Sequence, residues 1–257
     1  MLACASVWPG PVLLVEASED GGALASRFGL GFEPGLTTLT AALRHERTTT
    51  DLVSHCQPLP GTDERIVALV GPPATEQAQV LLRSVAARLD GVLTETDDET
   101  VLVDVGRLNA APLAAPLIAS ADRLVLVARP RVEELQALSH RLDGVARIGP
   151  PPELLLIGDR PYGPAEIAAT LGCPVVGVLA HDPGAADALA AVAAVRRLGR
   201  SPLLRTAAGV VQRFTQPRTP PAPTRRQWSS GTVEGVAVVS GGGVEVASSR
   251  WSALRRA

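Results

Sequence analysis

The chain has 257 residues, a formal net charge of −2 and a pI near 6.1, so its overall charge does not indicate a nucleic-acid-binding protein. Hydrophobic residues make up 46% of it, enough for the core of one large domain or two small ones. Aromatic residues are only 3%, so Ala, Val and Leu must build that core. All 24 Lys-or-Arg residues are arginine, which excludes any site that needs a lysine from this chain.

Cysteine usage and the termini indicate a cytoplasmic protein. Cys4, Cys56 and Cys173 are far apart and odd in number, with neither metal-site nor disulfide spacing, as expected in a reducing compartment. The N-terminus lacks the basic and apolar regions of a secretory signal. No stretch approaches the ~20 apolar residues that a membrane helix needs.

Short apolar runs alternate with helical patterns from residue 11 to about residue 195. The runs lack polar alternation, as is typical of strands covered on both faces: Pro11–Glu16, Arg65–Val70, Val101–Val105, Arg123–Ala128, Leu154–Gly158 and Pro174–Leu179. The helical patterns lie between them: Thr75–Leu89, Ala110–Ala119, Val132–Leu142, Pro164–Leu171 and Pro183–Leu198. This alternation predicts an α/β fold with a doubly wound, mostly parallel sheet.

The composition changes at Gln212. We predict an α/β domain over residues 1–211, a Pro/Arg-rich linker over 212–232, and a β-hairpin or disordered tail over 233–257. The tail holds the last apolar run, Gly235–Val244, in which a strand pattern leads into Ser-Gly-Gly-Gly-Val.

Several segments, in order, resemble the MinD/ParA superfamily of deviant P-loop ATPases, and most closely its MinD-like and CpaE-like actinobacterial branch. Val12–Gly22 resembles the family's strand with a D-x-D motif, and Phe28–Leu43 resembles its G-L…P-G-L…L…A-L segment. Val101–Gly106 is similar to its Walker B strand, and Ala121–Pro130 to the strand and turn that follow. Two later stretches resemble loops on the nucleotide side: Gly158–Tyr162 and Val178–Pro183.

The resemblance implies a P-loop NTPase-like fold that binds ATP and Mg²⁺ and works in spatial positioning: chromosome partitioning, septum placement, or pilus or flagellar assembly. In this register Met1–Trp8 falls on the helix that follows the phosphate-binding loop. The first strand and the Walker A loop are therefore expected to be missing. Family members act as nucleotide-dependent switches, so a homodimer or a protein partner is implied.

The resemblance also implies site residues. Glu16 and Ser18 occupy the degenerate D-x-D positions, which in the family position the attacking water. Asp104 would hold Mg²⁺ through water, while Arg129, Asp159 and Arg160 would contact the nucleotide. Glu16 is one methylene longer than aspartate and Ser18 carries no charge. Since a misplacement of about 1 Å can cost ~100-fold in rate, we expect weak hydrolysis.

A missing first strand would leave the Val101–Val105 strand beside an empty position. That position stays open, closes by collapse of the sheet, or is filled by another segment. Gly235–Val244 is the only spare apolar strand near a terminus, and its Ser-Gly-Gly-Gly even resembles the missing loop, although Glu245 would repel phosphate there. A Gly-turned hairpin explains the same residues.

Three alternatives remain open: a non-enzymatic pseudo-ATPase that keeps partner surfaces, an ATPase whose start codon is placed too late, and a phosphoacceptor receiver domain. The absence of lysine argues against the last. The histidines lack metal spacing. Arginines near the C-terminal end could contact membrane or DNA, or form a solvated face: Arg196, Arg197, Arg200, Arg205, Arg213, Arg218, Arg225 and Arg226.

Overall fold

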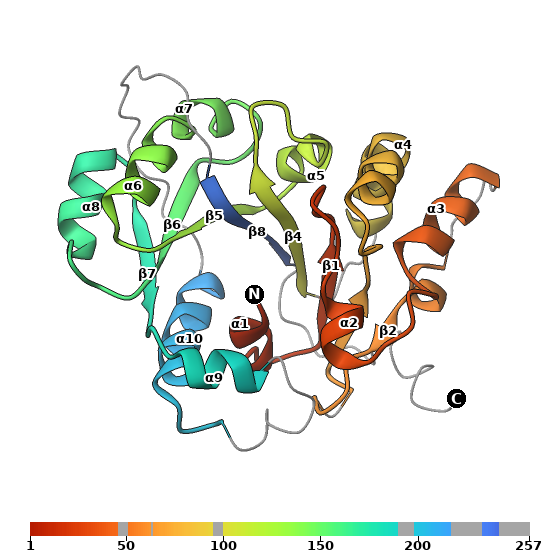
Figure 1. The fold of residues 1–257 in the computed structure, drawn as a ribbon, viewed down its shortest axis with the longest axis horizontal. Helices are drawn as coiled ribbons and strands as arrows, with labels where there is room; N and C mark the ends of the chain where they lie inside the picture. The colour runs from red at the N-terminus through yellow and green to blue at the C-terminus, as the bar shows by residue number, and fades with distance from the viewer. Residues whose placement is uncertain (46–50, 63, 95–99, 190–197, 217–232, 242–257) are drawn as a thin grey trace.

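A computed structural model describes residues 1–45, 51–62, 64–94, 100–189, 198–216 and 233–241. These residues form one sheet of eight strands with helices on both faces (Figure 1). The strand order is β2-β3-β1-β4-β8-β5-β6-β7. The predicted α/β fold with a mostly parallel sheet is confirmed.

Two parallel groups of strands make up most of the sheet. In the first, β1 (Val12–Glu16) lies between β3 (Ile66–Leu69) and β4 (Thr100–Leu108). The two-residue β2 (Gln57–Pro58) closes the edge beside β3 in antiparallel orientation. The second group runs β5 (Arg123–Ala128), β6 (Pro152–Ile157) and β7 (Val175–Leu179).

The strand between the two groups is the C-terminal β8 (Val233–Gly241). It pairs antiparallel with β4 from Thr100 to Leu108 and with β5 from Arg123 to Leu126. The position beside the Val101–Val105 strand is therefore filled, by the only segment that the sequence offered for it. Filling it satisfies the backbone donors and acceptors of two neighbouring buried strands.

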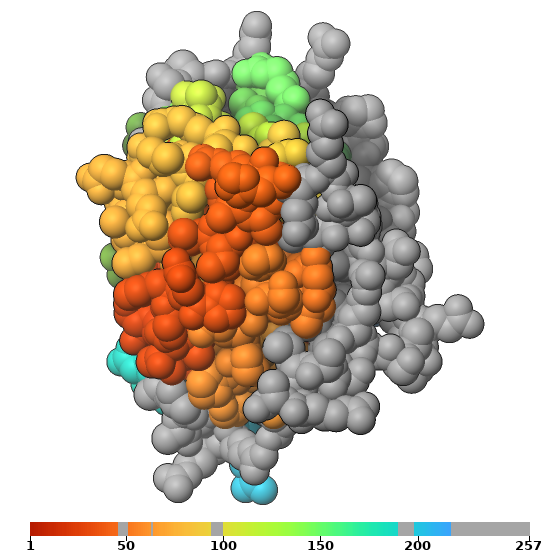
Figure 2. Space-filling model, turned by 90° about the vertical axis from the view of Figure 1, so that its right-hand side faces the viewer, coloured from red at the N-terminus to blue at the C-terminus, as the bar shows by residue number. Residues whose placement is uncertain are grey.

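Helices cover the two faces as separate layers, each with its own apolar cluster. One layer contains α3 (Leu36–His45), α4 (Thr75–Thr94), α5 (Ala115–Ala119), α6 (Val132–Ser139), α7 (Leu142–Val145) and α8 (Pro164–Leu171). The other contains α1 (Leu2–Ser6), α2 (Leu24–Phe28), α9 (Pro183–Leu189) and α10 (Pro202–Phe214). A short 3-10 helix, η1 (Leu52–His55), follows α3. Figure 2 shows one side of the molecule, where α3 and α4 lie at the surface.

Side-chain alternation along β1 explains why both faces need a helical layer. Leu13 and Val15 belong to the cluster under α3 and α4, while Val12 and Leu14 belong to the cluster under α1 and α10. All four are fully buried, so the sequence of the strand is a continuous apolar run. This pattern is the reason the strands were predictable from sequence.

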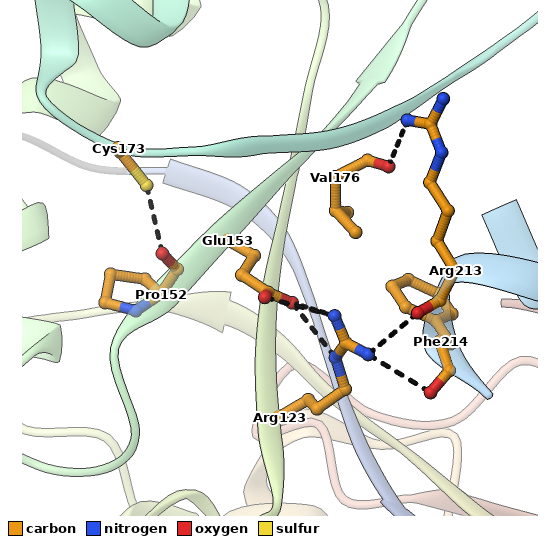
Figure 3. A network of polar contacts seen from close by, with 7 residues as sticks. All are labelled: Arg123, Pro152, Glu153, Cys173, Val176, Arg213 and Phe214. Carbon is orange, nitrogen blue, oxygen red and sulfur yellow. Dashed lines mark hydrogen bonds and ion pairs between the residues drawn. The ribbon is translucent and has the colours of Figure 1, made fainter. Parts of the chain in front are cut away.

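Arg123 fixes the C-terminal end of α10 to the sheet (Figure 3). Its guanidinium forms a two-pronged ion pair with Glu153 on β6, with a shortest N–O distance of 2.9 Å. It also donates to the carbonyls of Arg213 and Phe214 at 3.2 and 3.1 Å and lies over the Phe214 ring. Phe214 in turn stacks on Trp8, which joins α10 to the segment after α1.

The predicted elements differ from the structure at their ends, and α3 and α10 were not among the predicted helices. The helix predicted for Ala110–Ala119 begins only at Ala115, because Pro112 and the Asn109 side chain organise a turn before it. The predicted strand Val101–Val105 continues to Leu108 because β8 extends the pairing. Of the helix predicted for Pro183–Leu198, the part from residue 190 to 197 falls outside the described residues.

Candidate functional site

A cavity of about 580 Å³ opens at the carboxyl edge of the sheet, where ligands of doubly wound folds bind. Its walls come from the ends of β1 and β4, from α1, α2 and α9, and from Arg129 after β5. Two of the predicted site residues meet there in register: Glu16 on β1 is the strand partner of Asp104 on β4. This pairing places both residues at the same edge of the sheet.

Glu16 is buried, and its carboxylate is already used by the chain itself. One oxygen accepts the N–H groups of Ala23 and Leu24 at 2.7 and 2.8 Å, at the start of α2. The other accepts the N–H of Gly71 at 3.0 Å, in the loop after β3. Burial raises the pKa of Glu16 above its ordinary 4.5; these three hydrogen bonds oppose the rise, and nearby Asp104 adds to it. The carboxylate therefore joins three segments rather than presenting itself to a water molecule.

Asp104 and Ser18 both lie beside Gly106, at a turn that requires a glycine. Asp104 accepts the N–H of Gly106 at 2.9 Å, and Gly106 has a φ of +69°, where a side chain would be strained. A Cβ at Gly106 would also lie 2.8 Å from the Cβ of Ser18. The Ser18 hydroxyl accepts the N–H of Asp20 at 3.1 Å. Both predicted residues line the cavity.

Of the three other residues predicted to contact the nucleotide, one lines the cavity and two do not. Arg129 lines the cavity, and Glu134 lies 3.9 Å from its guanidinium and accepts its backbone N–H. Asp159 and Arg160 are exposed and do not belong to the cavity lining. Sequence reasoning did not single out four other lining residues, although the last three lie in or just beyond a stretch that resembled a nucleotide-side loop: Arg27, His181, Asp182 and Asp187.

Two helices at the cavity, α2 and α9, have N-termini capped by carboxylates of the chain, while α1 begins in the cavity lining without a side-chain cap. Glu16 takes the first N–H groups of α2, and Asp182 accepts the N–H of Ala185 at 3.0 Å at the start of α9. Free N–H groups at a helix start are what phosphate normally binds. A phosphate group at either helix would have to displace a carboxylate already in place.

The charge balance of the cavity also disfavours a triphosphate. Four carboxylates line it, those of Glu16, Asp104, Asp182 and Asp187, against the two guanidiniums of Arg27 and Arg129. The chain contains no lysine to add positive charge. Since like charges at short range repel strongly in a partly buried site, the residues present do not fit a Mg·ATP complex held as in a P-loop protein.

The glycine-rich end of β8 does not supply the missing phosphate loop. Because β8 runs antiparallel to β4, its start at Val233 pairs with Leu108 and its end at Gly241 pairs with Thr100. Gly241 therefore lies at the amino edge of the sheet, opposite the cavity. The resemblance of Ser-Gly-Gly-Gly to a phosphate loop was wrong, because strand direction was not encoded in that short pattern.

Replacing Glu16 by glutamine should destabilise the fold by about 1–2 kcal/mol at neutral pH. The amide oxygen can keep the bonds to Ala23 and Leu24, but the amide NH₂ then faces the N–H of Gly71, so two donors oppose each other. Chemical unfolding of E16Q measures the loss. Asp20→Asn is the control, because Asp20 is exposed and its change should leave stability within about 0.5 kcal/mol.

The loss in the free energy of unfolding caused by E16Q should also depend on pH, and it should be larger at low pH. Burial raises the pKa of Glu16 in the folded state, so the folded state binds a proton more readily than the unfolded one. The resulting stability is present below the ordinary pKa of 4.5 and is lost as pH rises through the folded pKa. Glutamine lacks this contribution, so E16Q should cost more at pH 5 than at pH 8; a larger cost at pH 8 would contradict the assignment.

No protein-family model and no curated protein matches the sequence. Solved structures do match. A ParA family ATPase from Chlorobium tepidum is similar with a TM-score of 0.65 and 18% identity, over 82% of this chain and 90% of that one. The septum site-determining protein MinD of Pyrococcus horikoshii, complexed with Mg-ADP, has a TM-score of 0.56 and 16% identity over 83% and 86%. The MinC:MinD cell division protein complex of Aquifex aeolicus matches with a TM-score of 0.59 and 12% identity, over 86% of this chain and 92% of that one.

These matches cover most of each chain, and their TM-scores lie between 0.56 and 0.65. The resemblance of the sequence to the ParA/MinD superfamily is thereby confirmed at the level of the fold. The protein has the fold of the ParA and MinD P-loop ATPases.

Proposed function

We propose that this protein is a ParA/MinD-fold protein of the spatial-positioning type that does not hydrolyse ATP and acts by binding a protein partner. The observation that carries the proposal is β8, which runs antiparallel between β4 and β5. In P-loop ATPases of this fold the strand beside the Walker B strand leads into the phosphate loop at the carboxyl edge. An antiparallel strand there brings its start, not a following loop, to that edge.

The arrangement of the cavity supports the same proposal. The starts of α2 and α9 are occupied by Glu16 and Asp182, and the cavity lining is acidic on balance. An ATPase needs donors that point at the charge developing on the transferred phosphoryl group. We assign Glu16 a positioning role for α2 and the loop after β3, and no catalytic step to Ser18.

A second candidate is a nucleotide-dependent switch in which Asp104 holds Mg²⁺ through water. The observation in its favour is the register that places Glu16 beside Asp104 within one cavity, as a P-loop ATPase of this fold would require. A phosphate-loop strand supplied from upstream would need the place that β8 occupies. The two arrangements therefore exclude each other, and β8 would have to leave before a nucleotide could be bound.

Titration calorimetry with Mg·ATP should show no binding up to about 1 mM, and phosphate release should stay at the level of buffer. The reason is that carboxylates occupy the starts of α2 and α9 and that the lining is acidic. D104N should behave like the parent protein. A dissociation constant in the low micromolar range that weakens in D104N would establish the switch instead. A ParA ATPase measured in parallel shows that the nucleotide is competent.

We further propose a cytoplasmic location with a protein partner or a second copy as the binding partner. None of the described helices is both long and apolar enough to cross a membrane. Contact with a membrane or DNA through the C-terminal arginines stays a prediction; of these, Arg200 and Arg205 lie exposed, and the guanidinium of Arg213 donates to the carbonyl of Val176.

A further inference from the structure

The lining of the cavity at the carboxyl edge is apolar in part. Aliphatic side chains contribute to it, among them Leu24, Ile157, Leu179, Leu189 and Leu203. The four leucines in this set are buried and belong to the apolar cluster beneath α1 and α10, so this part of the lining is packed core. The volume of about 580 Å³ falls within the roughly 300–1,000 Å³ of pockets that enclose a small molecule.

Three aspartates in the lining keep unused hydrogen-bond acceptors. A carboxylate can accept about four hydrogen bonds. Asp104 accepts one, from the N–H of Gly106, and Asp182 accepts one, from the N–H of Ala185. Asp187 is exposed and accepts none from the residues that the structure describes. The lining therefore offers more acceptor positions than the described part of the chain fills.

The chain also leaves a repulsion between two carboxylates of the lining uncompensated. Glu16 and Asp104 are register partners on adjacent parallel strands, which lie about 4.8 Å apart. Burial raises the pKa of Glu16, and the negative charge of Asp104 adds to the rise. Of the two guanidiniums in the lining, that of Arg129 lies 3.9 Å from Glu134, and that of Arg27 is exposed. Within the described ranges neither forms an ion pair with these two carboxylates, so a positive charge on a ligand would relieve their repulsion.

We propose that the cavity binds a small organic cation: a primary amine or a guanidinium compound with an apolar body. The body packs on the leucines, and the N–H groups of the cationic end donate to the free carboxylate oxygens of Asp104 and Asp187. An ammonium group has three donors and no acceptor, and a guanidinium has five donors, which matches a lining with unused acceptors. The inference rests on the proposed function in one respect, that the cavity holds no Mg·ATP, and it gives the same cavity a ligand class.

Three probes with one phenylethyl body and different charges test the proposal. Phenethylamine is a cation at neutral pH, phenethyl alcohol is uncharged, and hydrocinnamate is an anion. In ligand-observed NMR titrations of the full chain, phenethylamine should bind with a dissociation constant below about 1 mM. Phenethyl alcohol should bind at least about 10-fold more weakly, because a hydrogen bond to a charged group contributes more than one between neutral groups. Hydrocinnamate should show no binding.

Variants that remove one charge locate the bound cation. Asp104→Asn keeps an oxygen for the N–H of Gly106, and Asp187→Asn changes an exposed side chain, so both should stay folded, which circular dichroism checks. Each should weaken phenethylamine binding about 3- to 10-fold and leave phenethyl alcohol binding unchanged. Asp159→Asn is the matched control, because Asp159 is exposed and lies outside the cavity lining. It makes the same change in net charge and should affect none of the probes.

Equal affinity for phenethylamine and phenethyl alcohol would overturn the inference, as would phenethylamine binding that D104N, D187N and D159N leave alike. Tighter binding of hydrocinnamate would show that Arg27 and the uncapped start of α1 set the charge preference, which also overturns it. These results leave the proposed function standing. The proposed function fails if Mg·ATP binds with a dissociation constant in the low micromolar range that weakens in D104N, and that result would remove the premise of this inference as well.

Discussion

Removal of residues 217–257 should lower the midpoint of thermal unfolding by more than about 10 °C, or leave the protein aggregated. The truncation deletes β8, whose pairing satisfies the edges of both β4 and β5. Unpaired buried donors and acceptors cost roughly 1–3 kcal/mol each, and 1 kcal/mol shifts the midpoint by about 2–4 °C in a domain of this size. Calorimetry on the purified chains measures the change.

Deletion of residues 242–257 alone is the matched control, because it keeps β8 complete. This shorter deletion should leave the midpoint within about 2 °C of the parent value. Val238→Pro tests the same idea at one position, since Val238 pairs with Val103 on one side and Leu124 on the other. Proline cannot donate to a sheet, so V238P should reproduce most of the truncation. An unchanged midpoint in both would show that the sheet does not depend on this strand.

The sequence could indicate that a missing first strand would leave the Val101–Val105 strand without a neighbour, but not which of three outcomes would follow. Gly235–Val244 was the only spare apolar run near a terminus, and a Gly-turned hairpin explained the same residues. The strand begins beside Leu108 and runs antiparallel to β4, and no local sequence pattern encodes that direction. For this reason the interpretation of Ser-Gly-Gly-Gly as a phosphate loop failed, although the strand that leads into it fills the position beside β4.

The candidate site was also predictable from the sequence only in part. Resemblance brought Glu16 and Asp104 to one edge correctly, since carboxyl ends of parallel strands share an edge. It could not foresee that the Glu16 carboxylate would be taken by the N–H groups of Ala23, Leu24 and Gly71. The longer side chain reaches those donors, and backbone N–H groups carry no sequence signature. The capping of α9 by Asp182 was missed for the same reason.

Replacing Arg123 by methionine should destabilise the fold by about 3–5 kcal/mol. Arg123 and Glu153 are both nearly buried, with side chains 9% and 12% exposed, so removal of the guanidinium leaves a charged carboxylate deprived of its ion pair. The same change removes the donors to the Arg213 and Phe214 carbonyls and the cation over the Phe214 ring. Urea unfolding of R123M gives the free energy of unfolding for comparison with the parent.

Two further variants show which part of the network carries the loss. Arg129→Met removes a guanidinium 3.9 Å from Glu134 at the surface, where an ion pair contributes little, so it should cost less than about 0.5 kcal/mol. The double variant R123M/E153L removes both buried charges together and should recover part of the loss. The loss in the free energy of unfolding that remains in the double variant measures the contacts between Arg123 and the end of α10.

Amide hydrogen exchange then shows which part of the protein R123M destabilises. The Arg123 network holds the last turn of α10, the point from which the chain departs toward β8, and Phe214 connects that turn to Trp8. If this network couples the end of α10 to β8, R123M should accelerate amide exchange in Val210–Phe214 and in β8 before it does so in β1 or β3. Equal acceleration throughout the sheet would mean that Arg123 contributes only to global stability and that the position of β8 does not depend on the end of α10.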